Sequence, residues 1–300
     1  GVTTSDCHYK GGLPGVDNGR IMFDQVRVPR ENLLNKYADV APDGTYTSPI
    51  ENPNRRFFTM LGTLIRGRVT VGGSAAAAGR VALDIAVRYG LERRQFSAPD
   101  DEGEVVIMDY LVHQRRLLPL IARSYALQFA QNELVARLHD VQTAEFPDAE
   151  EQRELESRAA GLKAANTWHA SAAIQEAREA CGGAGYLAEN RLIALRADTD
   201  VFTTFEGDNH VLTQLVAKEM LTAYADDVKG MSPVEWVRFA ANFAGDRVLK
   251  RTAAETIMQT ILDSRQDNEE EGSLFNRGTQ VTMFEDREEY LLSSVARRMQ

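Results

Sequence analysis

The feature that most restricts the fold is a helical repeat of apolar residues that begins near Arg55 and persists over most of the chain. Apolar positions recur at helical spacing over residues 56–96, 105–140 and 149–180, and again from about Asn209 to Tyr224. Helices of this length must bury their apolar faces against one another, so the sequence predicts a mainly α-helical protein built around a four-helix bundle. Two further helices are expected over 233–265 and 285–300.

The first of these helices contains a run of small residues, GGSAAAAG at 72–79. A glycine inside a helix costs about 1 kcal/mol relative to alanine, so such a run needs a compensating gain. Because small residues let two backbones approach closely, we expect this helix to pack tightly against a partner helix.

Residues 1–40 follow a different pattern. In GRIMFDQVRVP, apolar side chains from Ile21 to Val28 alternate with polar ones, which predicts strands that end at Pro29. Residues 41–55 are rich in turn formers and predict a linker. The expected organisation is a strand-rich segment (1–40), the linker (41–55), the helical bundle (56–228) and a second helical region (229–300). The ends of the chain suggest a piece of a longer protein.

Composition and charge exclude several functions. The net charge is −10 and the basic residues are scattered, so we expect no nucleic-acid partner. No stretch has the length and apolarity of a membrane span. Cys7 and Cys181 lie far apart without a CxxC motif, which argues against a zinc site or a disulfide framework and suits a reducing interior. Paired Glu-x-x-His units are absent, so no metal site is expected.

Two short motifs each allow a structural and a functional interpretation. LERRQF at 91–96 could be the basic end of a helix, stabilised by its dipole, or could supply a guanidinium that reaches a phosphate. CGGAGY at 181–186 could be a loop that ends a helix, or a glycine surface that lets a flat or phosphate-bearing ligand come close.

A third motif, TDVFTTFEGDNH at 199–210, places Glu206 after Phe202 and Phe205 and just before an expected helix. Acidic residues favour helix N-termini, so Glu206 could be a capping residue. A carboxylate among apolar side chains is also a stronger base than one in water, and a strong base can remove a weakly acidic C–H proton. The residues alone leave both interpretations open.

Together, the three motifs resemble the acyl-CoA dehydrogenase and oxidase superfamily, and DTDVFTTFEGDN and REACGGAGY resemble its acyl-CoA oxidase branch. In that family the catalytic base follows the aromatic residue of a Gly-Gly-x-Gly-aromatic motif by twenty residues, which is also the separation of Tyr186 and Glu206. VDNGRIMFDQVRVPRENLL resembles the end of the family's middle β-domain, 56–225 its helical bundle, and the residues after 230 the additional helical domain of the oxidases.

The resemblance implies an FAD-dependent acyl-CoA oxidase of fatty acid β-oxidation. Glu206 would be the catalytic base that takes a proton from the carbon next to the thioester carbonyl of a fatty acyl-CoA. A hydride would leave the neighbouring carbon for flavin N5, giving a trans-2-enoyl-CoA, and O2 would then be reduced to H2O2. The enzyme would act as a homodimer or a higher homo-oligomer.

Carried over position by position, the resemblance implies that Arg93 reaches the FAD pyrophosphate of a neighbouring subunit and that Arg68 helps to place the substrate. The other implied cofactor contacts are Gln95, Phe96, Gly182, Gly183, Gly185, Gly207 and Asp208. Because the family's first helical domain and most of its β-domain have no counterpart in this chain, we expect the 300 residues alone not to hold FAD tightly and to be inactive.

Two alternatives remain at this point. An acyl-CoA dehydrogenase, which passes its electrons to a flavoprotein, differs from an oxidase only in its reaction with oxygen. A non-catalytic helical module used for oligomerisation would need neither Glu206 nor Arg93.

Overall fold

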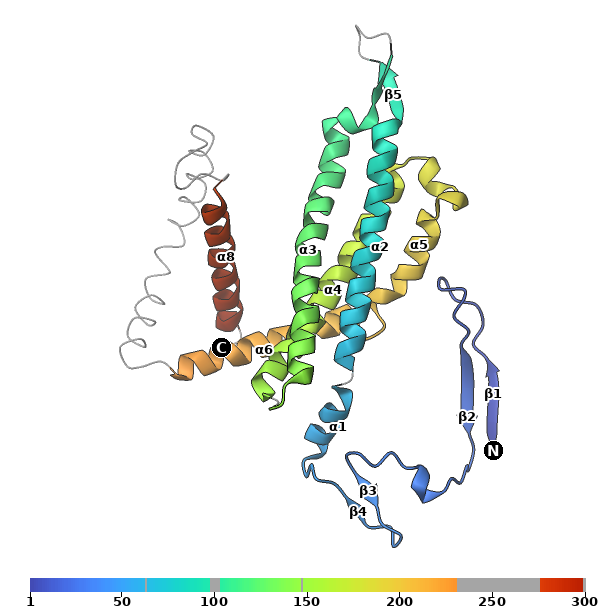
Figure 1. Ribbon diagram of the computed structural model, residues 1–300, viewed down its shortest axis with the longest axis vertical. Helices are drawn as coiled ribbons and strands as arrows, with labels where there is room; N and C mark the ends of the chain where they lie inside the picture. Colours follow the sequence, from blue (N-terminus) through green and yellow to red (C-terminus); the bar gives the residue numbers. More distant parts are fainter. Residues whose placement is uncertain (63, 98–102, 147, 231–275, 299–300) are drawn as a thin grey trace. The chain divides into compact units, whose positions relative to one another are not determined.

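The computed structural model describes residues 1–62, 64–97, 103–146, 148–230 and 276–298 (Figure 1). The chain divides into two compact units, Gly1–Val216 and Ala217–Gln300. Helices dominate the described residues, which confirms the prediction of a mainly α-helical fold. All candidate site residues belong to the first unit.

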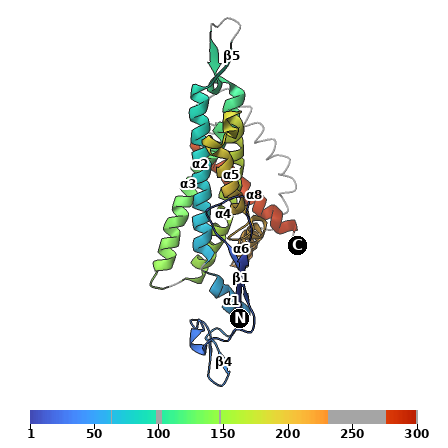
Figure 2. The same cartoon turned by 90° about the vertical axis from the view of Figure 1, so that its right-hand side faces the viewer.

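Three long helices form the body of the first unit and lie side by side (Figures 1 and 2). They are α2 (Leu64–Glu92), α3 (Leu111–Thr143) and α4 (Ala149–Ala180). The shorter α5 (Leu192–Asp200) packs against α4 and has no counterpart among the predicted helices. The fourth long helix, α6 (Asn209–Gly230), contributes buried residues near its N-terminus, such as Leu212, to this unit.

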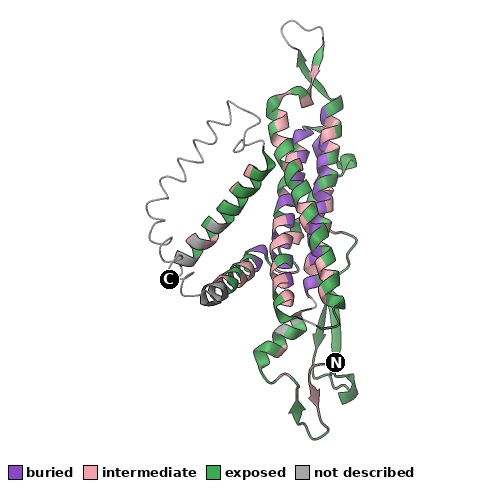
Figure 3. Ribbon diagram, turned by 60° about the vertical axis from the view of Figure 1, so that its left-hand side comes forward, coloured by how far each residue is buried: buried purple, intermediate pink, exposed green. Residues whose placement is uncertain are grey.

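The small residues of α2 let it approach α4 closely, as the sequence predicts. A Cβ added to Gly72 would lie 3.4 Å from Cα of Lys163, and one added to Gly79 would lie 3.5 Å from Cα of Ala170. Ala75 and Ala82 are fully buried in the same interface. Buried positions follow the facing sides of the long helices (Figure 3).

Several predicted helix ends are wrong. The segment expected as one helix over 56–96 contains two, because α1 (Pro53–Leu61) precedes α2. The Asn52 side chain caps α1 by accepting hydrogen bonds from the backbone N–H groups of Asn54 and Arg55, so this helix begins before residue 56. The helix expected over 105–140 is α3, which begins later and ends later than predicted.

The LERRQF motif ends in a β-hairpin, which corrects the interpretation of the whole motif as a basic helix end. After α2 ends at Glu92, β5 (Arg94–Ser97) pairs antiparallel with β6 (Glu104–Val106), and the 3-10 helix η2 (Ile107–Asp109) leads into α3. The hairpin is irregular because the register shifts between Gln95 and Ser97, where Phe96 has a φ of 58°.

The N-terminal segment is strand-rich as expected, but its strands are shorter. β1 (Val2–Asp6) pairs antiparallel with β2 (Gly19–Phe23), and the predicted continuation to Val28 is wrong because Gln25 adopts a φ of 48° and interrupts the extended chain. The 3-10 helix η1 (Arg30–Asn32) follows. A second small pair, β3 (Asp39–Val40) and β4 (Tyr46–Thr47), extends into the predicted linker.

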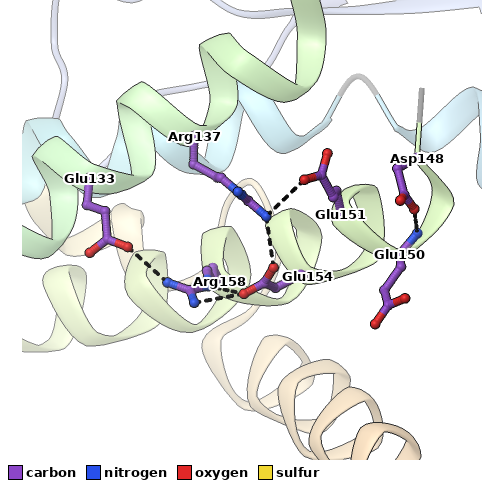
Figure 4. Close-up of polar contacts among 7 residues, drawn as sticks. All are labelled: Glu133, Arg137, Asp148, Glu150, Glu151, Glu154 and Arg158. Atoms are coloured by element: carbon purple, nitrogen blue, oxygen red, sulfur yellow. Dashed lines mark hydrogen bonds and ion pairs between the residues drawn. The ribbon is translucent and has the colours of Figure 1, made fainter. Parts of the chain in front are cut away.

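An ion-pair network joins α3 to the start of α4 (Figure 4). Arg137 of α3 contacts two carboxylates of α4, and Arg158 of α4 contacts one carboxylate on each helix; the acidic partners are Glu133, Glu151 and Glu154. The Asp148 side chain caps α4 by accepting from the backbone N–H of Glu150. These contacts hold the C-terminal part of α3 against the start of α4, and α4 has the bounds that the sequence predicts.

The second unit contains α8 (Arg277–Arg298), which begins earlier than the helix expected over 285–300. The Asn276 side chain accepts hydrogen bonds from the backbone N–H groups of Gly278 and Thr279, so the helix is capped there. The helix expected over 233–265 lies outside the described residues.

Candidate active site

Glu206 lies in the loop between the 3-10 helix η5 (Val201–Thr203) and α6. Asp208, two residues later, caps α6: its Oδ1 accepts from the backbone N–H of His210 at 2.9 Å and from that of Val211 at 3.4 Å. The helix therefore has a capping residue other than Glu206.

The Glu206 side chain points towards the start of α2. A Cβ added to Gly67 would lie 2.4 Å from Oε2 of Glu206, so the glycine provides the space that the carboxylate occupies. The Oε2 atom is buried and has no hydrogen-bond partner among the described residues. A buried polar atom without a partner is costly, and such atoms in native proteins often mark a ligand-binding or catalytic role.

The backbone of the loop is unusual at two consecutive residues. Glu206 has a φ of 56° and Gly207 a φ of 108°. A left-handed conformation costs a non-glycine residue about 1 kcal/mol or more, so surrounding contacts must hold Glu206 in it. Gly207 also has a steric requirement, because its Cβ would lie 2.9 Å from Cδ2 of Leu212.

Two cations donate hydrogen bonds to successive carbonyl groups of this loop. Nε of Arg68, on α2, donates to the Glu206 carbonyl oxygen at 3.4 Å. Nζ of Lys163, on α4, donates to the Gly207 carbonyl oxygen at 2.7 Å. The structure thus brings Arg68 to the backbone of Glu206, and the role in substrate placement that the resemblance implies for Arg68 stays a prediction.

Lys163 is a residue that the sequence reasoning missed. Its side chain has 0% exposure, and its Nζ also donates to Oδ1 of Asn209 at 3.0 Å. Burial lowers the pKa of Lys163, the nearby Asp208 carboxylate opposes that shift, Arg68 adds to it and Glu206 opposes it. The only sequence signal was a lone lysine among the buried positions of a helix.

Aromatic side chains adjoin Glu206. The rings of Phe202 and Phe205 stack with centroids 5.3 Å apart. Phe202 packs against the main hydrophobic cluster, while Phe205 is exposed. The expectation that Glu206 is next to large apolar groups therefore agrees with the structure on one side of the loop.

The other two motifs meet at the opposite end of α2. A pocket of about 340 Å³ is lined by Arg93, Gln95 and Phe96 from one motif and by Cys181 and Gly182 from the other. Further lining residues, which the sequence reasoning missed, include Tyr110, His113 and Glu179. The Tyr110 hydroxyl donates to the Gln95 carbonyl oxygen at 2.7 Å and so ties the hairpin to the start of α3.

The three glycines of CGGAGY have different reasons to be glycine. Gly182 has a φ of 57° directly after the C-cap of α4, which is the usual position of a left-handed glycine, so the helix-ending interpretation holds for it. A Cβ on Gly185 would lie 2.0 Å from the Arg178 carbonyl oxygen, so the fold excludes it. Gly183 has a φ of −61° and open space around its Cβ position. The described part of the chain gives no steric reason for glycine there, which leaves room for a ligand.

The two groups of candidate residues lie far apart. Gly67 and Glu92 are 25 residues apart on α2, which corresponds to roughly 38 Å at 1.5 Å per residue. Figure 1 shows β5 at one end of α2 and α1 at the other. Glu206, Arg68 and Lys163 therefore form one site, which we call the base site, and Arg93 with the CGGAGY loop forms another, the hairpin pocket.

The described residues contain no cluster of three or more His, Cys, Asp or Glu side chains that could hold a metal ion. None of the helices in the described ranges combines the length and apolarity needed to cross a membrane.

The first unit thus has a three-helix body with the half-buried Glu206 at one end and a pocket lined by Arg93 and Gly182 at the other. Residues 61–221 match the model of the acyl-CoA oxidase C-alpha1 domain, and the chain belongs to the acyl-CoA oxidase family. It is 47% identical over 232 residues to acyl-coenzyme A oxidase 3, peroxisomal, of Arabidopsis thaliana, covering 77% of this chain and 34% of that relative.

Solved structures of acyl-CoA oxidases support the same family assignment. Acyl-CoA oxidase 1 from Yarrowia lipolytica superposes with a TM-score of 0.70 at 35% identity, covering 77% of this chain and 35% of that one. Acyl-CoA oxidase-1 of Caenorhabditis elegans, solved in complex with FAD and ATP, gives a TM-score of 0.66 at 30% identity, over 78% of this chain and 34% of that one. The chain spans about a third of the length of the curated relatives that it matches.

Proposed function

We propose that the protein in which these residues occur is an FAD-dependent acyl-CoA oxidase, which converts a fatty acyl-CoA to a trans-2-enoyl-CoA and reduces O2 to H2O2, with Glu206 as its catalytic base. The observation that carries the proposal is the buried Oε2 of Glu206, which lacks a hydrogen-bond partner among the described residues. Family membership supports the reaction class.

The role of Glu206 is to take a proton from the α-carbon of the thioester. The α C–H bond breaks, its proton goes to the carboxylate, and the β-hydrogen leaves as hydride. Bound flavin supplies the hydride acceptor. An α-proton is a weak acid, so the base must be desolvated and aimed, and the partnerless oxygen beside Gly67 meets both conditions. Arg68 and Lys163 fix the backbone from which the base extends.

The hairpin pocket supports FAD as the cofactor. The Arg93 side chain is exposed and has no ion-pair partner among the described residues, so it is free to pair with a phosphate. Gly183 leaves open space where a flat or phosphate-bearing group could approach the backbone. Gln95, Phe96 and Gly182 line the same pocket, and Gly185 holds the loop in shape.

The separation of the two sites favours a homodimer or a higher homo-oligomer. Arg93 lies roughly 38 Å from the base site along α2, by the rise of the helix. We infer that the hairpin pocket contacts the FAD whose reactive ring belongs to a second subunit. In a eukaryote the enzyme would be peroxisomal, the location given in the name of the Arabidopsis relative.

The test is Glu206→Gln in the full-length protein, with Glu189→Gln on an exposed turn as the matched control. An amide in place of the carboxylate cannot accept the proton, so turnover with palmitoyl-CoA should fall about 1,000-fold or more while the flavin absorbance is retained. The control should turn over like the wild type, with one H2O2 formed per O2 consumed.

Each failure of this test has a distinct meaning. If Glu206→Gln retains about a tenth or more of the wild-type turnover, Glu206 is not the base. Flavin reduction by substrate without peroxide formation would identify a dehydrogenase that uses another electron acceptor. A Glu206→Gln variant that keeps full biological function would identify a non-catalytic helical module.

A further inference from the structure

Lys163 connects the body of the bundle to the loop that carries the base. Its ammonium group has two acceptors that flank Asp208: the Gly207 carbonyl oxygen at 2.7 Å and Oδ1 of Asn209 at 3.0 Å. Asn209 is itself held, because its Nδ2 donates to Oγ1 of Thr167 at 2.9 Å. One buried cation on α4 therefore fixes both sides of the turn that follows Glu206.

We propose that Lys163 is a positioning residue for the catalytic base: by holding the Gly207 carbonyl it keeps Glu206 in its left-handed conformation and its carboxylate directed at the space beside Gly67. This inference rests on the proposed function, in which Glu206 is the base. Lys163 itself does not touch the substrate in this assignment, and it acts through the backbone of the loop.

The geometry makes Lys163 the stronger of the two cationic contacts. The hydrogen bond from Arg68 to the Glu206 carbonyl is 3.4 Å long, beyond the usual range for an N–H···O bond, whereas the bond from Lys163 is 2.7 Å. Both donors are charged, so the difference in length decides which bond is stronger. Lys163 therefore contributes more than Arg68 to holding the loop in which Glu206 has a φ of 56°.

Packing alone does not account for a lysine at this position. A charged group removed from water carries a desolvation penalty, and an apolar residue of similar volume commonly stabilises a protein equally well or better. Lys163 has 0% exposure, and burial lowers its pKa, which shows that the fold holds the ammonium group at a cost. The gain that offsets this cost is the fixed turn at Gly207 and Asn209.

The experiment compares Lys163→Met with Asn166→Leu in the full-length flavoprotein. Asn166 is the matched control: it lies one turn further along α4 with 0% exposure, and its Nδ2 donates to Oε1 of Gln131, away from the base loop. Each substitution replaces a buried polar side chain by an apolar one. Both variants should lose thermal stability, because each leaves an acceptor without its donor, but only Lys163→Met should release the loop.

Two measurements separate positioning from general structural damage. Flavin reduction at saturating acyl-CoA in a single turnover should slow about 30-fold in Lys163→Met, with KM changed by less than about threefold, because transition-state alignment is lost and substrate binding is kept. Backbone amide exchange in the peptide spanning residues 201–212 should accelerate in the same variant. Asn166→Leu should retain the wild-type reduction rate within about twofold and leave that peptide protected.

Glu206→Gln, measured in parallel, distinguishes failure of this inference from failure of the proposed function. If Glu206→Gln is inactive and Lys163→Met reduces its flavin at the wild-type rate, Lys163 is not a positioning residue, although Glu206 is still the base. An equal loss of rate in Lys163→Met and Asn166→Leu also overturns the inference. If Lys163→Met does not fold, Lys163→Gln, which keeps an uncharged NH2 donor group, takes its place. Its rate of flavin reduction should lie between that of the wild type and that expected for Lys163→Met.

Discussion

The functional groups at the two ends of α2 differ in how far this chain encloses them. At the base site the functional group is enclosed: Glu206 is half-buried, and Arg68 and Lys163 hold its loop from two different helices. At the hairpin pocket the functional groups are open to solvent: Arg93 is exposed, and Phe96 is 74% exposed on an irregular strand.

The fold alone sets the geometry of the residues at the base site, whereas the residues of the hairpin pocket need a bound ligand to complete their contacts. An enclosed carboxylate on a constrained backbone is organised before any ligand arrives, which is what a base acting on a weak carbon acid requires. An exposed aromatic side chain and an arginine without an ion-pair partner among the described residues gain little from the fold itself. We therefore expect substitutions to affect rate at the first site and cofactor affinity at the second.

Gly67→Ala tests the enclosed end and should give the largest effect among the substitutions that leave Glu206 itself unchanged. The new Cβ would lie 2.4 Å from Oε2 and 2.6 Å from Cδ of Glu206, so the carboxylate must move away. Flavin reduction at saturating substrate in the full-length protein should fall about 100-fold, because small displacements of a catalytic group are costly. The melting temperature should stay the same or rise, since alanine replaces glycine inside a helix and the group displaced is the end of a flexible side chain.

Gly79→Ala is the control for that experiment. It makes the same change on the same helix, and its Cβ would lie 3.5 Å from Cα of Ala170, an ordinary contact far from Glu206. It should keep the wild-type rate. Equal losses of rate in both variants would mean that α2 packing, and not the space beside Gly67, controls the base.

The sequence predicted the parts of this molecule that local patterns encode. The bounds of α4 follow from its apolar repeat together with the glycines that end it, and the close packing of α2 follows from GGSAAAAG. The resemblance carried by three motifs led to the family. Each of these signals lies within a short stretch of chain or in the spacing of such stretches.

The parts that the sequence did not predict depend on contacts between distant segments. Lys163 is 43 residues before Glu206, and only the packing of α4 against the loop reveals its role. The sequence reasoning considered only Glu206 as a cap of α6, and the hydrogen bonds to the Asp208 side chain show which residue caps the helix. The β5–β6 hairpin interrupts a basic segment that local propensity assigned to a helix end.

Substitutions in the CGGAGY loop should give effects of intermediate size and test the open end. Gly185→Ala forces a Cβ to within 2.0 Å of the Arg178 carbonyl oxygen, so it should lower the free energy of unfolding by about 2 kcal/mol or more. Gly183→Ala adds a Cβ that meets nothing within 4 Å, at a φ of −61°, so the stability of the flavin-free protein should not change. Its affinity for FAD should fall about tenfold, because the methyl group occupies the approach to the backbone.

Thermal melting of the flavin-free protein and a flavin titration of the full-length variants measure the two quantities. If Gly183→Ala binds FAD as well as the wild type does, no ligand approaches the hairpin pocket at this residue. The expectation that substitutions in this pocket change cofactor affinity would then be wrong. In thermal melting of the flavin-free protein, Gly182→Ala provides the reference for a conformational cost, since its φ is 57° and its Cβ position is open.

The smallest expected effect concerns pH and two histidines that lie at different depths. His169, at 3% exposure on α4, accepts or donates one hydrogen bond through Nε2 with Oγ of Ser124 at 2.7 Å, while its buried Nδ1 has no partner among the described residues. Burial lowers the pKa of His169, and the positive charge of Arg123 lowers it further. His113, which is half-buried in the hairpin pocket, has its pKa lowered by burial and then by Arg116.

The sign of the pH dependence follows from these directions. The unfolded chain takes up protons on its histidines near pH 6.5, and the folded chain resists until a lower pH, so stability is full above about 6.5 and falls as the solution is acidified. His169→Gln should reduce the loss of stability between pH 7.5 and 5.5, measured by urea unfolding, and His113→Gln, at a less buried position, should reduce it by less. If saturating FAD suppresses the contribution of His113 to the pH dependence of stability and leaves that of His169 intact, the ligand covers the hairpin pocket. An equal effect of FAD on both contributions would show that FAD stabilises the bundle without contacting that end.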